Sequence, residues 1–436
     1  MGAFKEQFLL RIVFPFAEKF VGTCASKWYW RIKDMNTWSA SQITAWQNEQ
    51  LRHFVKHAYE HTKYYRELFD SLKLNPKDIQ CSADLAKLPI LTKEILRNRY
   101  ADFIPDDIDN ISHRIDHTGG STGNPMEYLE DENVWGYCTA HKMISWKATG
   151  YHFGDKFIAL GSASILQKKP SLVRRIYDKL RGEIALNSMN LDDDLCQKYV
   201  DRIRNEHIQH IYGYATAIYL LASYAKRKQI QLRIHAYTTS ENLTPMYRRT
   251  IEDAFGYRVM DCYGARDAGM TSYEVTPGYF NIGHIAIAEI VDTYAENTGT
   301  LVTTCFMNNC MPLMRYSYGD DATLTTNYDI YNGQVITKIQ GRTSDVIRLK
   351  NGHNLTGPGF TILMLNFEVV AFEIRQLSDC AILMRVQPKK TFNDAQEKRL
   401  IGELKRFAGE GCDVSIEKVD HFEELKNGKH RFFYNA

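Results

Sequence analysis

The stretch His117-Thr118-Gly119-Gly120-Ser121-Thr122-Gly123-Asn124-Pro125 combines three glycines with three hydroxyl residues and a following proline. Glycines permit a tight turn, and the backbone N–H groups of such a turn can surround phosphate oxygens while hydroxyls donate further hydrogen bonds. The stretch is neither a Gly-x-x-x-x-Gly-Lys-[Ser/Thr] loop nor a Gly-x-Gly-x-x-Gly fingerprint. It therefore predicts either a phosphate-binding loop or an ordinary polar turn.

C-terminal to this stretch, helix-like and strand-like segments alternate. The periodicity predicts helices over 131–149, 192–204, 217–227 and 245–255, and strands over 156–160, 210–212, 233–238 and 258–262. Strands that alternate with helices of ten or more residues indicate α/β layers with parallel strand pairing.

The pattern differs on either side of this region. The first hundred residues are expected to be mainly helical, with apolar side chains every three or four positions over 39–65. From residue 282 onward, strands are expected over 285–291, 300–304 and 335–339, near Leu324, and again over 381–386 and 414–419, with a helix over 394–407. We place a domain boundary near 341–345, between a large domain of residues 1–341 and a small domain of residues 342–436.

The N-terminal segment 4–16 is dense in apolar side chains but is interrupted by Lys5, Glu6 and Arg11. These charges exclude a signal-peptide core or a membrane-spanning run. Two interpretations remain, a helix packed on the body of the protein or a helix lying at a membrane surface. Packing is the commoner use of such a helix and is the one we favour.

Composition bounds the function. The 436 residues are 44% hydrophobic and 24% charged, and Lys plus Arg at 54 against Asp plus Glu at 52 leave a net charge of only +2. A strong basic field for nucleic-acid binding is therefore excluded. The nine cysteines are scattered and odd in number, which is typical of reduced thiols in a cytoplasmic protein. Cys305 and Cys310 lack the partner ligands of a zinc site.

Four further segments carry residues suited to nucleotide chemistry, although each alone also fits an ordinary turn or strand end. A tyrosine beside a glycine in Asp261–Asp267 could lie on a purine, and its last carboxylate could hold Mg²⁺. Asp320, after Gly319, could accept hydrogen bonds from ribose hydroxyls. The others are the segment Gly341–Arg348 and the tail Asn427–Arg431, where a lysine could approach a developing phosphorane.

Taken in order, these five segments resemble the signature motifs of the adenylate-forming superfamily, which includes acyl-CoA synthetases, peptide-synthetase adenylation domains and luciferases. The short length and the Tyr-Gly-x-Arg-Asp pattern of 263–267 are similar to the phenylacetate–CoA ligase-like subfamily, as are Gly283-His284-Ile285 and the segment 311–316. Within that subfamily the chain looks most like proteins of capsular-polysaccharide gene clusters. The resemblance covers roughly residues 40 to 432.

The resemblance implies a large N-terminal α/β domain with a β subdomain and a small mobile C-terminal α+β lid. It implies an enzyme that uses ATP and Mg²⁺ to convert a small carboxylic acid into an acyl-AMP with release of pyrophosphate. CoA would then take the acyl group, although a sugar amine or hydroxyl as direct acceptor stays open. Two other functions also stay open, a non-catalytic nucleotide-binding relative and a phosphotransferase that forms ADP. A homodimer and peripheral membrane contact through the N-terminal helix stay open as well.

The same resemblance assigns roles by position. The implied ATP- and AMP-binding residues are Thr118, Gly119, Gly120, Ser121, Thr122, Gly123, Ser240, Glu241, Tyr263, Gly264, Asp320 and Arg342. The implied catalytic residues are Lys429, Arg342 and Asp267, and Asp267 would hold Mg²⁺ directly or through water. Candidate walls of the acid pocket are Trp146, Tyr212, Tyr214 and Tyr237, which also fit core aromatics.

The chain departs from the family pattern at three positions. Asn124 stands where the phosphate loop usually has lysine, which removes a positive charge. Asp267 is a methylene shorter than the usual glutamate, and Ser344 replaces an acidic hinge residue. His284 is expected to be a packed or pocket-edge residue rather than a metal ligand.

Overall fold

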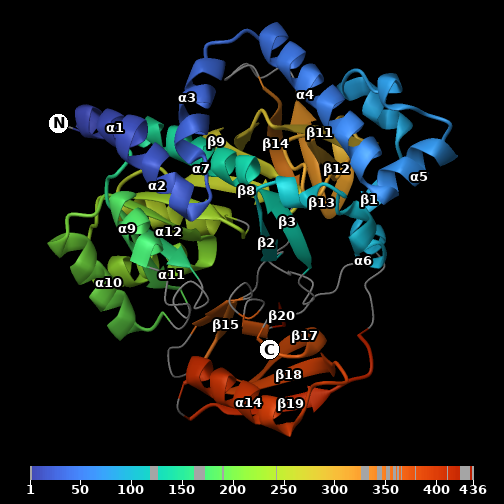
Figure 1. The fold of residues 1–436 in the computed structure, drawn as a ribbon. Helices are drawn as coiled ribbons and strands as arrows, with labels where there is room; N and C mark the ends of the chain where they lie inside the picture. The colour runs from blue at the N-terminus through green and yellow to red at the C-terminus, as the bar shows by residue number, and fades with distance from the viewer. Residues whose placement is uncertain are drawn as a thin grey trace. The chain divides into compact units, whose positions relative to one another are not determined.

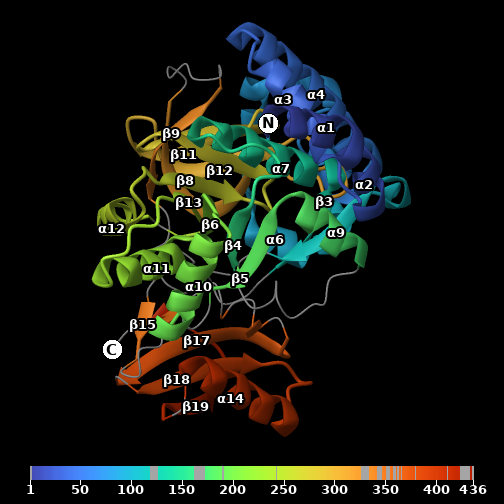
Figure 2. The same cartoon turned by 90° about the vertical axis from the view of Figure 1, so that its left-hand side faces the viewer.

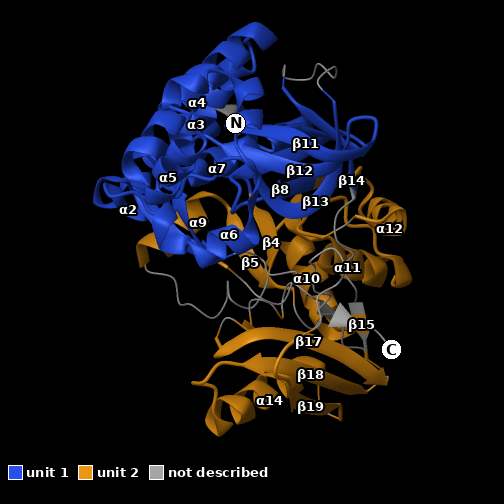
Figure 3. Ribbon diagram, turned by 90° about the vertical axis from the view of Figure 1, so that its right-hand side faces the viewer, with its two compact units in different colours: residues 1–118, 127–155, 262–341 blue, residues 119–126, 156–261, 342–436 orange. Residues whose placement is uncertain are grey.

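The computed structural model describes residues 2–117, 126–161, 172–188, 191–241, 243–325, 333–340, 346–349, 354–356, 360, 363–364, 366–378, 380–409, 411–422 and 433–434. The chain forms two compact units, coloured separately in Figure 3. Unit 1 comprises residues 1–118, 127–155 and 262–341, and unit 2 comprises residues 119–126, 156–261 and 342–436. The segment 341–345 lies outside the described residues, so the domain boundary placed there stays a prediction.

Unit 1 begins with the helical region that the sequence predicts. Its longer helices are α1 (Gly2–Phe8), the π-helix η1 (Leu9–Val13), α2 (Phe14–Val21), α3 (Ala25–Met35), α4 (Ala40–His61), α5 (Lys63–Ser71), α6 (Lys93–Asn98) and α7 (Glu132–Trp146). Its 3₁₀ turns are η2 (Pro76–Asp78), η3 (Ser82–Lys87), η4 (Tyr100–Phe103), η5 (Ile108–Asn110) and η6 (Lys147–Thr149).

The helical stretch expected over 39–65 is interrupted at one residue. Ser39 starts α4 with a capping box, in which its Oγ accepts from the Gln42 backbone N–H and its own N–H donates to the Gln42 side chain. Thr62 then takes an extended conformation and caps α5 by accepting from the Tyr65 backbone N–H. This local side-chain bond replaces the helical bond, so one periodic stretch becomes two helices.

The sheet of unit 1 runs in the order β11-β12-β13-β14-β10-β9-β8 with antiparallel neighbours, and β1 pairs in parallel with β13. Its strands are β1 (Leu91–Thr92), β8 (Met260–Ala265), β9 (Met270–Thr276), β10 (Tyr279–Ile282), β11 (Ala286–Ala295), β12 (Thr298–Cys305), β13 (Tyr316–Thr325) and β14 (Val335–Gln340). Helix α7 packs on β9 and on α3 (Figure 1). A separate hairpin joins β2 (His113–His117) to β3 (Glu127–Asp131).

In unit 2, residues 156–261 form the expected α/β layers (Figure 2). The strands pair in parallel in the order β5-β4-β6-β7, and β7 also pairs with the first two residues of β8. They are β4 (Phe157–Gly161), β5 (Glu183–Asn187), β6 (His210–Tyr214) and β7 (His235–Thr239), with helices α9 (Leu172–Leu180), α10 (Asp193–Asn205), α11 (Ala215–Arg227) and α12 (Pro245–Phe255). Their apolar core contains Ile158, Ile211, Ile218, Ile251 and Phe255.

The C-terminal part of the chain has its own core. Its strands pair in the order β19-β18-β17-β20, beside a β15–β16 hairpin. The elements are β15 (Val346–Arg348), β16 (Asn354–Thr356), β17 (Val369–Ser378), β18 (Ala381–Pro388), α14 (Asp394–Ala408), β19 (Asp413–Lys418) and β20 (Phe433–Tyr434). Phe372, Ile374, Met384, Leu400 and Leu404 are buried together. The expected α+β character of this part is confirmed.

Candidate nucleotide-binding site

The β2–β3 hairpin carries the glycine-rich stretch. Residues 118–125 lie outside the described residues, and the last pair of the hairpin before them is His117 with Glu127. At its other end β3 leads directly into α7, because Asp131 ends the strand and its carboxylate accepts from the Asn133 backbone N–H at 2.8 Å. Asn308 accepts from the Asp131 backbone N–H at 2.9 Å. The base of the hairpin is thereby tied to both a helix and a neighbouring loop.

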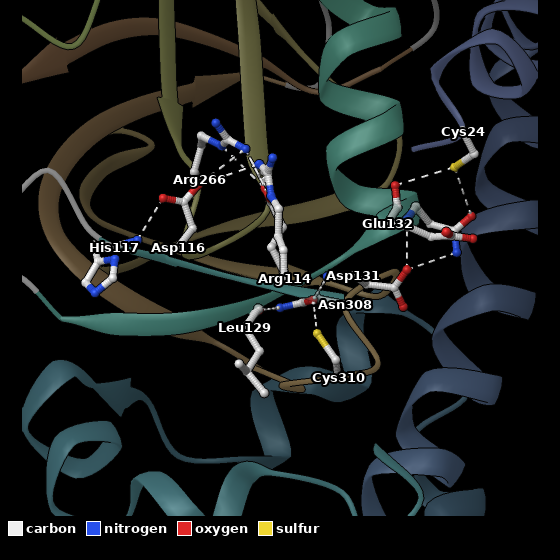
Figure 4. A network of polar contacts seen from close by, with 12 residues as sticks. Cys24, Arg114, Asp116, His117, Leu129, Asp131, Glu132, Arg266, Asn308 and Cys310 are labelled. Atoms are coloured by element: carbon white, nitrogen blue, oxygen red, sulfur yellow. Dashed lines mark hydrogen bonds and ion pairs between the residues drawn. The ribbon is translucent and has the colours of Figure 1, made fainter. Parts of the chain in front are cut away.

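Arg114 and Arg266 lie close together in Figure 4, and both donate to the buried carboxylate of Glu130 in this hairpin. Arg114 donates to it from Nε at 2.7 Å, and Arg266 donates from Nη2 at 2.8 Å. The second arginine also lies 3.7 Å from Asp116. A fully buried carboxylate needs such partners, since an unpaired charge in the interior is costly. Sequence reasoning missed this network, although Arg266 stands inside the Tyr-Gly-x-Arg-Asp segment.

Tyr263 and Gly264 lie at the end of β8. The Gly264 backbone approaches β9 so closely that an added Cβ would stand 2.8 Å from the Met270 carbonyl oxygen, which explains the glycine structurally. The Tyr263 hydroxyl donates to Asp320 Oδ2 on β13 at 3.0 Å. Burial raises the pKa of Tyr263, with Tyr318 and Asp320 adding to the effect, so the phenol stays a hydrogen-bond donor.

Asp267 lies in the turn that follows β8. It is 8% exposed, and its Oδ2 accepts from the Tyr316 hydroxyl at 3.0 Å. This contact joins the turn to β13, and the bond from Tyr263 to Asp320 joins β8 to the same strand. A single held carboxylate fits Mg²⁺, which usually keeps several waters and takes one or two carboxylates beside phosphate oxygens. The structure thus links Tyr263 on β8 and Asp267 in the following turn to β13, the strand that carries Asp320.

Ser240 and Glu241 follow β7 in unit 2. Ser240 has a φ of +67°, which is uncommon for a residue with a side chain. Glu241 is buried, and its Oε2 accepts from the Thr216 backbone N–H at 2.7 Å at the start of α11, where a carboxylate is favoured by the helix dipole. Burial raises the pKa of Glu241. Its Oε1 has no hydrogen-bond partner among the described residues.

The four candidate acid-pocket aromatics differ in burial. Trp146 in unit 1 is 1% exposed and meets Tyr151 edge to face at 5.3 Å. In unit 2, Tyr237 is fully buried with its hydroxyl 2.9 Å from His210 Nδ1, whereas Tyr212 and Tyr214 on β6 are half-buried. Packing accounts for the positions of the two buried residues. Their part in an acid pocket stays a prediction, as do the roles of Arg342 and Lys429, which lie outside the described residues.

Unit 1 contains a cavity of about 510 Å³, which is bordered by α4, the start of α7 and the segments 107–112 and 306–309. None of the predicted site residues that the structure describes lines this cavity. Two of its lining residues, His57 and Asp107, have potential ligand atoms within 4.8 Å of each other and of His61. His61 Nδ1 is 2.7 Å from Asp106, and His57 Nε2 is 3.2 Å from the Asn309 carbonyl. Hydrogen bonding therefore accounts for both histidines without a metal.

Two other expectations concern cysteine and histidine. All nine cysteines are free thiols, and Cys305 and Cys310 are both buried. His284 is 3% exposed and its backbone N–H donates to the Tyr137 hydroxyl at 2.7 Å. Burial lowers the pKa of His284 to about 4, as expected of a packed histidine.

Comparison with known proteins agrees with the resemblance seen in the motifs. The chain is 24% identical to Protein CapK of Staphylococcus aureus, over 89% of this chain and 88% of that protein. It is 25% identical to a phenylacetate–coenzyme A ligase of Pseudomonas putida, over 79% of each. No family model matches the chain.

The fold is that of an adenylate-forming CoA ligase. Among solved structures, 2-hydroxyisobutyryl-CoA ligase with 2-HIB-AMP and CoA in its thioesterification state aligns with a TM-score of 0.56. The alignment covers 92% of this chain and 91% of that one at 17% identity. The expected fold class is confirmed, and the similarity to the phenylacetate–CoA ligase-like subfamily is confirmed by the relatives.

Proposed function

We propose that this protein is an AMP-forming acid–CoA ligase. It activates a small carboxylic acid with ATP and Mg²⁺, releases pyrophosphate, and transfers the acyl group from acyl-AMP to the thiol of CoA. The observation that carries the proposal is the pair of contacts joining Tyr263 to Asp320 and Asp267 to Tyr316 at 3.0 Å each, in a chain with this fold. The first contact joins the residues expected to bind base and ribose, and the second ties the residue expected to hold the metal to β13, the strand that carries Asp320.

The proposed roles follow those contacts. The Tyr263 ring stacks on adenine, Asp320 accepts from ribose hydroxyls, and Asp267 holds Mg²⁺ directly or through water. In unit 2, the Ser240–Glu241 segment borders the adenine end of the nucleotide. The segment Thr118–Gly123, which connects β2 to β3 in the sequence, holds the β- and γ-phosphates.

The first step brings two anions together, because the acid carboxylate attacks the α-phosphate. One carboxylate oxygen forms a bond to phosphorus as the bond to pyrophosphate breaks. Cations and backbone N–H groups are the main requirement, and no general base is needed since the acid is already ionised. We assign Lys429 to the carboxylate and α-phosphate, and Arg342 to ribose or phosphate. The CoA thiol then loses its proton to solvent and its sulfur bonds to the carbonyl carbon, as the bond from that carbon to the phosphate oxygen breaks and AMP leaves.

The substrate and setting are proposed from the subfamily resemblance. The acid is small, and Trp146, Tyr212, Tyr214 and Tyr237 are the candidate walls of its pocket. The product serves surface-polysaccharide biosynthesis, and the enzyme works in the cytoplasm. Among the described residues, no helix is both long and apolar enough to cross a membrane.

The first experiment follows AMP and pyrophosphate release from Mg-ATP against small aromatic, aliphatic and amino acids, with and without CoA. AMP formation that depends on one acid is expected, followed by a thioester when CoA is present. Acyl-AMP that persists with CoA but is consumed by an amino sugar would make the sugar the acceptor. Tight ATP binding without AMP formation for any acid would favour a non-catalytic relative, and ADP as product would favour a phosphotransferase.

A matched pair of tail variants tests the assigned mechanism. Lys429→Ala is expected to slow acid-dependent ATP–pyrophosphate exchange by roughly 10²- to 10³-fold, the usual cost of removing one group that stabilises transition-state charge. Lys426→Ala removes the same charge three residues earlier and is expected to have little effect. Equal exchange rates in both variants would contradict the role of Lys429.

A further inference from the structure

Four large apolar side chains lie on the outer face of the N-terminal helices. Phe8, Ile12, Phe16 and Phe20 are 50%, 61%, 66% and 65% exposed, at a strict spacing of four residues. Residues four apart lie on one face of a helix, so the side chains form a stripe about 18 Å long. The Phe16 and Phe20 rings touch edge to face at 5.2 Å.

The inner face of the same helices is fixed to unit 1. Leu9, Leu10 and Phe14 are buried, and the Phe14 ring lies 4.3 Å from that of Phe153. The π-helix η1 precedes Pro15, which cannot donate to the carbonyl four residues earlier. The expected packing of this helix is therefore observed, but it uses only one of two apolar faces.

Acidic and basic side chains lie on different faces of these helices. Buried Glu6 accepts from Lys147 Nζ at 2.8 Å and from the Tyr29 hydroxyl at 3.0 Å. Glu18 is buried as well and accepts from the Ser26 backbone N–H at 2.9 Å. Within residues 5–22, all described, the exposed charged side chains are cationic.

These exposed cations are Lys5, Arg11 and Lys19. The Arg11 guanidinium lies 4.3 Å from the centre of the half-buried Trp30 ring, and tryptophan and arginine are both common at membrane–water interfaces. A stripe of apolar side chains on a segment whose own exposed charged residues are all cations is complementary to the surface of an anionic bilayer. A protein partner would more often leave exposed charges of both signs.

We propose that residues 5–22 dock this protein on an anionic phospholipid membrane, with Phe8, Ile12, Phe16 and Phe20 inserted among the lipids. The helix lies in the plane of the interface and does not cross it. Lys5, Arg11 and Lys19 contact lipid phosphates. This inference is independent of the chemistry proposed for the nucleotide site.

Flotation of the full chain with vesicles tests the proposal. Vesicles of phosphatidylcholine alone are compared with vesicles containing about 30 mol% phosphatidylglycerol. Binding is expected to the anionic vesicles and to weaken at least tenfold between low and high salt, because salt screens the cations. Failure to bind either vesicle, or equal binding to both, overturns the proposal.

Variants identify the surface. Ile12→Gln/Phe16→Gln/Phe20→Gln keeps good helix formers at exposed positions and is expected to reduce binding at least tenfold with unchanged ATP–pyrophosphate exchange. Leu377→Gln, also an exposed apolar residue at 57%, is the control and should bind as the parent does. Lys5→Gln/Lys19→Gln should lose the preference for anionic vesicles. The proposal is overturned if the triple variant binds vesicles as well as the parent does. It is also overturned if the parent protein is a dimer and the triple variant is a monomer.

Discussion

Asp267 and Asp320 carry the proposed metal and ribose contacts, and each is held by a tyrosine hydroxyl. The bond from Tyr316 to Asp267 spans 49 positions in the chain, and the bond from Tyr263 to Asp320 spans 57. Both carboxylates are therefore oriented before any nucleotide binds. Pre-orientation of this kind reduces the ordering cost of binding.

At the residue scale, Asp267→Asn is expected to weaken the apparent affinity for Mg²⁺ by more than about tenfold, because an amide cannot supply a negatively charged ligand. The measurement is the Mg²⁺ dependence of pyrophosphate release. Tyr316→Phe is the matched comparison, since it keeps the carboxylate and removes only the hydrogen bond that orients it. Its effect should be smaller, and an effect larger than that of Asp267→Asn would contradict the metal role.

Asp320→Ala is expected to raise KM for ATP by about 10- to 100-fold, because hydrogen bonds to a charged group contribute about 1.5–3 kcal/mol. The variant should leave KM for the acid nearly unchanged, which a general loss of structure would not. Tyr263→Phe keeps the aromatic ring and should change KM for ATP far less. Equal KM values for ATP in parent and Asp320→Ala would remove Asp320 from the ribose site.

At the scale of elements, the β2–β3 hairpin and the turn after β8 are joined through Glu130. The bonds from Arg266 to Glu130 link residues 136 positions apart. They connect the element that carries the glycine-rich stretch to the turn that carries Asp267. The network therefore ties the described part of the hairpin to the turn that carries Asp267.

Arg266→Ala is expected to lower the free energy of unfolding by about 2 kcal/mol. This is less than the 3–5 kcal/mol for breaking a fully buried pair, because Arg266 is half-exposed and Arg114 remains on Glu130. Arg202→Ala, which breaks an exposed pair with Glu206 on α10, should cost under about 1 kcal/mol. Urea unfolding measures both, and equal costs would contradict a structural role for the network.

At the scale of the whole molecule, two buried histidines make unit 1 sensitive to acid. Burial, with His284 adding to the effect, lowers the pKa of His141 to about 3, and burial lowers that of His284 to about 4. In the unfolded chain each titrates near 6.5. Between pH 6.5 and 4 the unfolded chain therefore binds protons that the folded chain does not, and stability falls as pH falls.

For each histidine, the free energy of unfolding is expected to fall by about 1.4 kcal/mol for every unit by which the pH is lowered in that window. His141→Gln should reduce the slope of unfolding free energy against pH by about that amount, measured by urea unfolding from pH 7.5 to 4.5. Above about pH 7.5 both histidines are almost fully deprotonated in the folded and the unfolded chain, so parent and variant should show parallel curves there. An unchanged slope below pH 6.5 would show that His141 does not resist protonation in the fold.

The residue pattern alone predicted the α/β layers over 156–261 and most of the longer helices, whereas the class of fold as a whole came from the resemblance of the motifs to a known family. Helix α12 has the predicted bounds, and α7, α10, α11, β4 and β6 begin within two residues of their expected starts. Periodicity reports which face of a segment is buried, and that is a local property. The β9–β10 pair was not expected, because these strands mix apolar and polar side chains without a clear periodicity. Their position in the fold depends on the order of strands in the sheet. Thr62 interrupted one expected helix by capping α5 with its own side chain.

For the site, motif order alone indicated Tyr263, Asp267 and Asp320, because their spacing resembles a known family. Only the tertiary structure paired them with each other and with Tyr316, and placed Arg114 and Arg266 on Glu130. It also decided which face of the N-terminal helices is buried. The reason is that contacts between residues dozens of positions apart depend on which strands become neighbours, and no local pattern of apolar and polar residues encodes that choice.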